Sequence, residues 1–338
     1  MDMLTHIKDR YMFRIERQIA KGGMGTIYEA TQLGAKEFEK KVAIKTVLPA
    51  LARNERFIEM FIAEGRLVAD LVHENIVQIY QLGHCSKAGY YIVMEYVHGL
   101  SLHDFIHFHS ATHERIPHEL AVFITSRIAR GLAYAHSRLD GEGTPLNIVH
   151  RDICPTNIMI TTEGLPKLGD FGIAKAASST VSANDRILMG KLFYMSPEQA
   201  QRIPVDHRSD VYSLGLVLFE LLALTRARSK WSKDILDAAR TGQVDWDALP
   251  DNVDPDLLTI LRHMLTADPD LRYADTSQVA YELEYFIYRE GYGPTVVTLE
   301  NYLRQNFPFL YMRASVPRKT AIMESVGRTA PLTTSPME

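Results

Sequence analysis

The sequence predicts an α+β protein made of two unequal lobes, and two observations support that prediction. Between Phe13 and Tyr96, short β-branched or aromatic runs predominate and indicate strands. After Gly99, longer apolar patterns with helical spacing take over, and the chain of 338 residues is too long for one minimal core. We therefore expect a small β-rich lobe at about residues 11–97 and a larger, mainly helical lobe at about 98–290.

Most of the small lobe is expected to be sheet. Five runs have the composition of strands, namely FRIERQIA, TIYEA, KVAIKTV, NIVQIYQLG and YYIVMEY. The segment from Glu55 to Val72 differs, because its apolar residues are spaced as on one face of a helix. The small lobe should therefore be a sheet with one helix.

The large lobe should open with PHELAVFITSRIARGLAYAHSR, a helix of about six turns whose proline suits the first turn. Three further helical patterns follow: SDVYSLGLVLFELLAL, DPDLLTILRHMLTAD and TSQVAYELEYFIYR. A short helical extension is expected at 291–310. Residues 311–338 are rich in Ser, Thr and Pro without a sustained period, which predicts a disordered tail.

Composition argues against several classes of function. The formal net charge of −4 gives no electrostatic reason to expect nucleic acid or an anionic membrane as partner. The two cysteines, Cys85 and Cys154, lack the spacing of a zinc site or a disulfide scaffold, which favours the reducing cytoplasm. No run approaches the roughly 20 apolar residues that cross a bilayer, so any membrane anchor is expected beyond residue 338.

The first motif with chemical content is AKGGMGTIYEA, residues 20–30, which lies between two strand-like runs. Glycines let backbone N–H groups approach phosphate oxygens that side chains would keep away. By itself the pattern slightly favours a glycine-rich hairpin turn.

A lysine and a glutamate follow this loop. Lys45 ends the strand-like VAIK, and Glu64 lies in the predicted helix. A strand lysine held by a helix glutamate places its ammonium on nucleotide phosphates, whereas the alternative is two unrelated surface charges.

The third group of residues is HRDICPTN at 150–157, followed by GDFG with Asp170. A carboxylate beside a transferred phosphoryl group accepts a hydroxyl proton, and an amide with a second carboxylate offers hard oxygen ligands to Mg²⁺. Isolated acids in loops are commonly turn caps. The order of glycine loop, VAIK, Glu, HRD, Asn, DFG and SPE argues against coincidence.

With these motifs in this order, residues 11–290 resemble the eukaryotic-like (Hanks-type) bacterial serine/threonine protein kinases. The resemblance implies a bilobal protein-kinase fold with ATP and Mg²⁺, or Mn²⁺ in its place, in the cleft. In that family Lys45 would contact phosphates and pair with Glu64, Asp152 would be the catalytic base, and Asn157 and Asp170 would hold the metal.

The resemblance also implies a nucleotide site. The run VMEYVHG, residues 93–99, would be the segment that joins the lobes. The backbone of Glu95 and Val97 in this segment would bind adenine, and Met94 would guard the back of the pocket. The adenine ring would lie between Ile27, Ala43 and Met159, and the phosphates under Ala20, Lys21, Gly22, Gly23, Met24 and Gly25.

Three further residues would have structural roles in such a fold. Glu198 of SPEQA would pair with Arg272 and so latch the large lobe, unless Arg272 is an ordinary surface arginine. Asp210 would brace the catalytic loop, which is HRDICPTN at 150–157, by accepting hydrogen bonds from its backbone N–H groups.

Two departures from the family pattern concern one contact. Cys154 stands where the family has the lysine that reaches the γ-phosphate. Lys191 stands where it has the threonine that hydrogen-bonds both that lysine and the catalytic Asp. Because both partners differ together, we interpret Lys191 as a relocated catalytic cation; the alternative is that it points into water.

The resemblance implies phosphorylation of Ser/Thr hydroxyls on protein substrates in bacterial signalling, with autophosphorylation through a transient dimer. Arg151, directly before the expected base, favours a phosphate on the activation segment, the stretch between DFG and SPE, because a guanidinium binds phosphate oxygens well. The candidate acceptors in this segment are Ser178, Ser179, Thr180 and Ser182. Two alternatives remain: a pseudokinase or scaffold module that binds nucleotide without turnover, favoured by Cys154, and a small-molecule kinase of similar fold.

Overall fold

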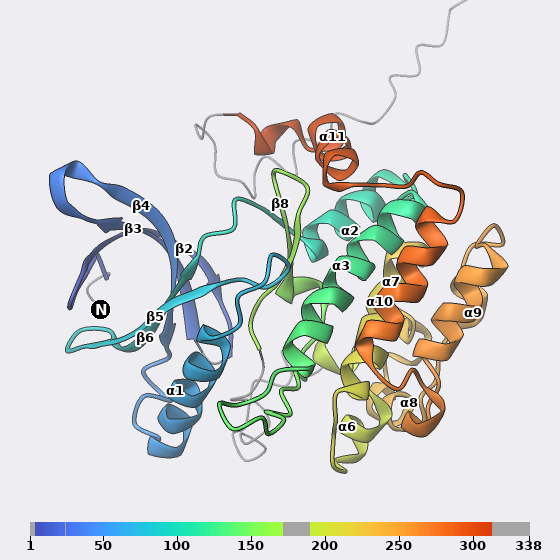
Figure 1. Cartoon of the computed structure of the whole chain (residues 1–338), viewed down its shortest axis with the longest axis horizontal. Coiled ribbons are helices and arrows are strands. Elements are labelled where there is room, and N and C mark those ends of the chain that lie inside the picture. The colour runs from blue at the N-terminus through green and yellow to red at the C-terminus, as the bar shows by residue number, and fades with distance from the viewer. Residues whose placement is uncertain (1–3, 24, 172–189, 313–338) are drawn as a thin grey trace, which may run out of the picture.

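The computed structural model describes residues 4–23, 25–171 and 190–312, without the side chain of Glu64. A small lobe dominated by one sheet lies beside a larger helical lobe (Figure 1). The α+β, two-lobed architecture predicted from the sequence is therefore confirmed.

The small lobe is an antiparallel sheet of six strands in the order β1-β2-β3-β4-β6-β5. The strands are β1 (His6–Lys8), β2 (Met12–Lys21), β3 (Gly25–Leu33), β4 (Glu39–Val47), β5 (Ile79–Cys85) and β6 (Gly89–Glu95). The single helix α1 (Glu55–Ala69) starts at Asn54, whose side chain accepts a hydrogen bond from Phe57 N. Strand β1 was not predicted, because it is only three residues long.

Helix α1 packs on β5 and β6 through Phe57 and Phe61, which contact Val47 and Ile92 in one apolar cluster. A second cluster, centred on Ile7, Phe13 and Tyr91, is separate from the first. Among the described residues, the sheet of the small lobe thus packs into two separate clusters, and a third cluster joins Val68 and Leu71 to the large lobe.

Eight α-helices of the large lobe lie wholly within the described residues. They are α2 (Leu102–Thr112), α3 (His118–His136), α6 (Pro197–Gln201), α7 (Arg208–Ala223), α8 (Ile235–Arg240), α9 (Pro255–Met264), α10 (Thr276–Tyr288) and α11 (Val296–Asn306). Its short 3₁₀ turns are η2 (Pro155–Asn157), η3 (Ser229–Trp231), η4 (Trp246–Ala248), η5 (Pro269–Leu271) and η6 (Pro308–Leu310), whereas η1 (Ala35–Glu37) lies in the small lobe between β3 and β4.

Helix α7 is the central element of this lobe, because its residues from Ser209 to Ala223 are all buried. A helix that is buried on every side belongs in the middle of a core. It contacts α3, α9 and α10, and one continuous apolar cluster extends through all four helices. The large lobe is therefore a single packed body.

A small sheet of β7 (Gly99–Ser101), β8 (Ile158–Thr161) and β9 (Pro166–Leu168) lies where the lobes meet, beside the label β8 in Figure 1. A Cβ atom on Gly99 would lie 1.8 Å from Ile160 O, so only glycine allows β7 this close to β8. On the far side, Leu168 O accepts a hydrogen bond from Val77 N at 2.8 Å and ties this sheet to the small lobe.

The C-terminal part extends the packed structure further than the composition suggests. Tyr311, grouped above with the tail, lies in the described part and donates a hydrogen bond to Thr162 O at 2.7 Å. Residues 313–338 lie outside it. Within the described residues, no helix is both long and apolar enough to span a bilayer.

Candidate active site

The glycine-rich segment forms the turn between β2 and β3, where Gly22 N donates to Gly25 O at 2.9 Å. A Cβ atom on Gly25 would lie 2.3 Å from Thr46 O, which is an impossible contact. Gly25 is therefore required for β3 to lie close to β4 beside Lys45. Met24 is outside the described residues.

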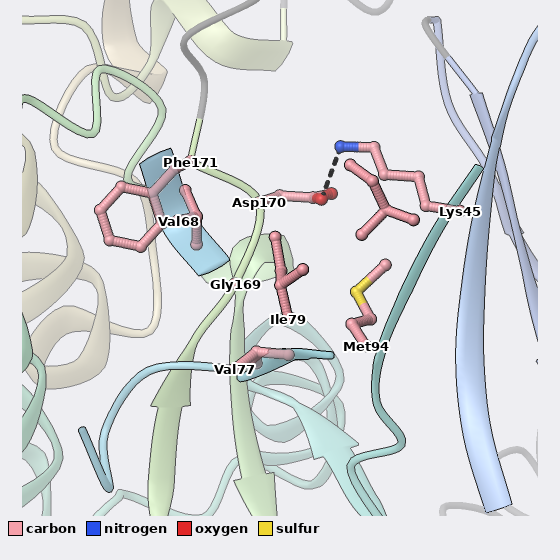
Figure 2. Close-up of a pocket in the computed structure, with 9 residues that line it drawn as sticks. Lys45, Val68, Val77, Ile79, Met94, Gly169, Asp170 and Phe171 are labelled. Carbon is pink, nitrogen blue, oxygen red and sulfur yellow. Dashed lines mark hydrogen bonds and ion pairs between the residues drawn. The ribbon is translucent and has the colours of Figure 1, made fainter. Parts of the chain in front are cut away.

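Lys45 on β4 reaches across to the large lobe, where its Nζ lies 2.8 Å from Asp170 Oδ1 (Figure 2). The lysine side chain is only 15% exposed and the aspartate 32%. The two residues expected at the phosphates and the metal are thus brought together from opposite lobes. The side chain of Glu64, the other expected partner of Lys45, lies outside the described residues.

An apolar cavity of about 20 Å³ lies beside this ion pair, as Figure 2 shows. Besides Lys45 and Asp170, its walls are Val68, Val77, Ile79, Ile92, Met94, Gly169 and Phe171. A space this small holds at most a water molecule or so, and its walls offer few polar partners. The ion pair therefore has an apolar, largely dry side.

The residue after Asp170 fixes its position. The Phe171 ring is buried and packs on the His150 ring with centroids 4.6 Å apart. It belongs to the same cluster as Val68 of α1. Asp170 itself has a left-handed backbone, with φ of 55°, which is costly for a residue with a side chain and is typical of functional sites.

The loop 150–157, which contains the expected base Asp152, is held by Asp210, which is fully buried. Its carboxylate accepts hydrogen bonds from His150 N at 2.7 Å, Arg151 N at 2.9 Å and His136 Nε2 at 2.8 Å. Burial disfavours its charge, but the hydrogen bond and the field of His136 outweigh burial and hold the Asp210 pKa below its usual value. The predicted bracing role is confirmed; His136 was not predicted, because it lies at the end of a helix, far from any motif.

Asp152 is the centre of a group of polar side chains. Asn157 Nδ2 donates to Asp152 Oδ2 at 2.7 Å and to its backbone oxygen at 2.8 Å. Lys191 Nζ lies 3.0 Å from Asp152 Oδ1 and 3.2 Å from Oδ2. Cys154 is buried and its Sγ lies 3.2 Å from Thr156 Oγ1. In the structure, the ammonium beside Asp152 is that of Lys191.

Asn157 and Asp170 suit a divalent cation. The amide nitrogen of Asn157 is used by Asp152, which leaves its oxygen as a ligand. Gly169 N donates to Asn157 O at 2.9 Å, so the chain segments of both residues are linked. No group of three or more His, Cys, Asp or Glu side chains gathers as a metal centre in the described ranges. One amide, one carboxylate and nucleotide oxygens are a donor set typical of Mg²⁺.

This arrangement matches a known domain. A family model described as "Protein kinase domain" matches residues 13–286. The chain belongs to the protein kinase family.

Two curated relatives and one solved structure show how far the similarity extends. The chain is 38% identical to Tyrosine-protein kinase MasK of Myxococcus xanthus over 86% of this chain and 45% of the relative. It is 40% identical to Serine/threonine-protein kinase PrkC of Bacillus subtilis over 62% of this chain and 30% of the relative. It thus spans less than half the length of either.

Among solved structures, the kinase domain of Mycobacterium tuberculosis PknI, as a C20A mutant, is similar with a TM-score of 0.62. The two sequences are 22% identical, and the match covers 84% of this chain and 98% of the other. At that identity the likeness establishes the fold alone.

The residues expected around adenine lie on both sides of the kinase cleft. Ala43 on β4 is the register partner of Met94 on β6, and Ile27 on β3 that of Lys45. Met159 lies on β8, in the large lobe. Of the segment joining the lobes, Glu95 is held by Lys167 Nζ, 3.0 Å from its Oε2.

The predicted latch of the kinase's large lobe is confirmed. Arg272 donates to both carboxylate oxygens of Glu198, at 2.7 and 2.8 Å, and both side chains are buried. The arginine also donates to Thr266 O and Ala267 O. A bidentate pair with its remaining donors satisfied is the geometry in which burial of charge is tolerated.

Sequence reasoning missed one buried arginine that holds the segment of Lys191. Arg228 is fully buried and donates to Leu192 O at 3.2 Å, to Met195 O at 2.7 Å and to Tyr212 Oη at 2.8 Å. It lies in the polar stretch RARSK, where nothing local distinguishes it from solvated neighbours. Only the path of the chain shows its role.

Proposed function

We propose that this protein transfers the γ-phosphoryl group of ATP to Ser or Thr hydroxyls of protein substrates. The observation that supports this most is the convergence at one cleft of Asp152, held by Asn157 and Lys191, and the Lys45–Asp170 pair. A base, a phosphate-binding cation and metal ligands are the groups that phosphoryl transfer uses, and the hydrogen bond from Gly169 N to Asn157 O links the two segments that carry the base and the metal ligands.

In this reaction Asp152 accepts the proton of the substrate hydroxyl, and the oxygen of that hydroxyl forms the new bond to the γ-phosphorus. The bond from that phosphorus to the oxygen it shares with the β-phosphate breaks, and ADP leaves. Lys45 neutralises charge on the phosphates. Mg²⁺ bound by Asn157 and Asp170 would supply electrostatic stabilisation of the phosphate oxygens, and Mn²⁺ would suit the same ligands.

For Lys191 we propose the role of the γ-phosphate cation that family members place two residues after the catalytic Asp. Its contact with both oxygens of Asp152 supports this, as does the burial of Cys154, which leaves no cation at the usual position. A donor at this place stabilises charge that grows during transfer.

For the nucleotide we propose the site that the resemblance implies. Adenine would be bound by the backbone of Glu95 and Val97, behind Met94. Lys45, with Glu64 as its second partner, would then reach the phosphates. The position of Met94 in the cavity wall beside Lys45 supports this placement.

We further propose that the activation segment carries a phosphate when the enzyme is active. The candidate acceptors Ser178, Ser179, Thr180 and Ser182 lie outside the described residues. Arg151 supports the proposal, because its Nε is buried and has no hydrogen-bond partner within the described ranges. One copy of the protein would phosphorylate the activation segment of a second copy within a transient dimer.

The acceptor needs a direct test, because relatives include a named tyrosine kinase and a named serine/threonine kinase. We favour Ser/Thr because the catalytic loop HRDICPTN does not match the tyrosine-kinase pattern. Mass spectrometry after incubation of the purified protein with Mg-ATP should show phosphoserine or phosphothreonine in residues 172–189. Phosphotyrosine alone would contradict the proposed acceptor.

A pseudokinase or scaffold module is the second candidate, and Cys154 at the lysine position is the observation that favours it. Turnover of ATP on a generic protein substrate separates the two, because a scaffold would bind nucleotide without forming ADP. We place the protein in the cytoplasm with protein substrates, and propose no role in binding nucleic acid or membrane.

A further inference from the structure

The family match ends at residue 286, but the packed structure continues. Leu299 and Leu303 of α11 and the following Phe307 are fully buried, and Leu310 is 3% exposed. Figure 1 shows α11 beside α2 and β8. Because these side chains belong to the main cluster of the large lobe, the segment 294–311 is an integral part of the domain.

The aromatic part of this contact is extensive. The Phe307 ring lies 4.4 Å from that of Phe108 and 5.4 Å from that of Phe105, measured between centroids. The ring centroids of Tyr302 and Phe105 are 6.1 Å apart. Aromatic pairs at these distances add to the free energy of burial, so α11 is held firmly on α2.

Helix α11 also touches the turn between β8 and β9. Gly164 in that turn has φ of +79°, and a Cβ atom on it would lie 2.1 Å from Val296 O and 2.6 Å from Glu300 N. Backbone atoms cannot move away as a flexible side chain can. The first turns of α11 therefore rest directly on the β8–β9 turn.

From this turn a chain of hydrogen bonds leads to the segment that joins the lobes. Tyr311 Oη donates to Thr162 O at 2.7 Å, and the Arg304 guanidinium lies 4.2 Å from the Tyr311 ring centroid. Thr162 N in turn donates to His98 O at 2.8 Å, and Thr162 Oγ1 lies 3.2 Å from His98 Nδ1. His98 follows Val97 directly.

We propose that α11 and Tyr311 act as a brace that positions the lobe-joining segment for nucleotide binding, with Tyr311 as a positioning residue. The brace holds Thr162, and Thr162 holds His98 next to the backbone groups at Glu95 and Val97. This inference depends on the adenine placement proposed above. Loss of the brace weakens nucleotide affinity without removing any group that touches the reacting atoms.

The first experiment compares Tyr311→Phe with Tyr292→Phe, each in the full chain. Tyr292 is 96% exposed and serves as the matched control. The dissociation constant of a fluorescent N-methylanthraniloyl ATP should rise about two- to tenfold in Tyr311→Phe, the effect of one hydrogen bond, and stay unchanged in Tyr292→Phe. The turnover number at saturating ATP should change less than twofold.

A purely structural role gives a different result. If Tyr311→Phe lowers the melting temperature while the dissociation constant stays that of the unchanged protein, the brace does not position the segment and the inference is wrong.

The second experiment compares two glycines that share a left-handed backbone. Gly164→Ala and Gly143→Ala impose similar strain, with φ of +79° and +84°, but an added Cβ atom meets nothing within 4 Å at Gly143. Gly164→Ala should therefore weaken nucleotide binding more than Tyr311→Phe does, and Gly143→Ala should leave it unchanged. Equal effects of the two substitutions would contradict a specific contact with α11.

Binding and phosphoryl transfer are measured separately, so the two proposals can fail separately. Altered affinity in the brace variants together with no transfer by any variant refutes the proposed function and supports the brace. Normal transfer with no difference in affinity refutes only the brace. If the unchanged protein does not bind the analogue, both the adenine placement and the brace are wrong.

Discussion

The two halves of the active site are built in different ways. The loop 150–157 is hydrogen-bonded to the body of the large lobe, since the buried Asp210 accepts from two of its N–H groups and the half-buried Gln199 donates from Nε2 to Arg151 O at 2.9 Å. Lys45 comes from a sheet whose core is divided into two separate clusters, and it meets Asp170 across the cleft. The large lobe thus holds the proposed catalytic groups in place by its own packing, whereas the proposed nucleotide half needs both lobes to meet.

The largest losses of phosphoryl transfer should come from removing a single charge from either half of the proposed site. Lys45→Met, Asp152→Asn and Asp170→Ala should each lower phosphoryl transfer by about 10²–10⁴ with the fold intact, because each charge acts on the transition state. Only the lysine belongs to the nucleotide half, so Lys45→Met should also weaken ATP binding. Transfer of radiolabelled phosphate and titration with nucleotide measure the two effects.

The exposed Lys233 provides a control for that series, since Lys233→Met should behave as the unchanged protein. Full activity of Asp152→Asn would mean that another group accepts the proton.

The next effect concerns the stability of the large lobe. Glu198→Ala leaves the guanidinium of Arg272 buried without its carboxylate, which should lower the free energy of unfolding by about 3–5 kcal/mol. The exposed pair Arg14–Glu39 is the control, and Glu39→Ala should cost less than about 1 kcal/mol. Chemical denaturation of both variants tests this. Similar losses in the two would mean that burial of the latch adds nothing.

Substitutions at Lys191 test whether the large lobe supplies the proposed γ-phosphate cation. Lys191→Ala should lower the turnover number by about 10²–10³, Cys154→Ala should have a mild effect, and Cys154→Lys with Lys191→Thr should recover activity. The effects of substitutions at contacting positions are expected to be non-additive. Recovery of activity in the double variant therefore decides whether the cation has moved from position 154 to position 191. Near-normal turnover of Lys191→Ala at saturating Mg-ATP would refute the relocated cation.

The smallest effect is a pH dependence of stability in the large lobe. Burial under α11 lowers the pKa of His109 from 6.5 to about 4, with only a backbone contact at Glu114 opposing it. The unfolded chain therefore binds a proton that the folded protein does not, and stability falls as the pH drops from about 6.5 to 4. The loss attributable to His109 is on the order of 3 kcal/mol.

His109→Phe should remove this part of the acid sensitivity, whereas the same change at the exposed His107 of α2 should not. Denaturation midpoints between pH 7 and 4 provide the comparison. If the denaturation midpoints of both variants change with pH as those of the unchanged protein do, His109 does not control the acid sensitivity.

Prediction from sequence worked best where the signal is local. The patterns for α3, α7, α9 and α10 agree with the observed helices within two residues or so at most ends. The composition of NIVQIYQLG predicts one strand, but β5 begins only at Ile79. Its first residues instead pair with Leu168, because Val77 N and Asn75 O hydrogen-bond there. A partner 91 residues or more away leaves no trace in a window of nine.

By itself, the sequence determined the order of the motifs, the identity of Lys45, Asp152, Asn157 and Asp170, and the change from strands to helices. These features depend on residue type and spacing, which a single chain shows directly. The tertiary structure alone decided that Lys191 contacts Asp152, that Arg228 holds the following segment and that Tyr311 reaches Thr162. Each of these joins residues between 33 and 149 positions apart. Such contacts follow from how the chain is packed, which local periodicity does not encode.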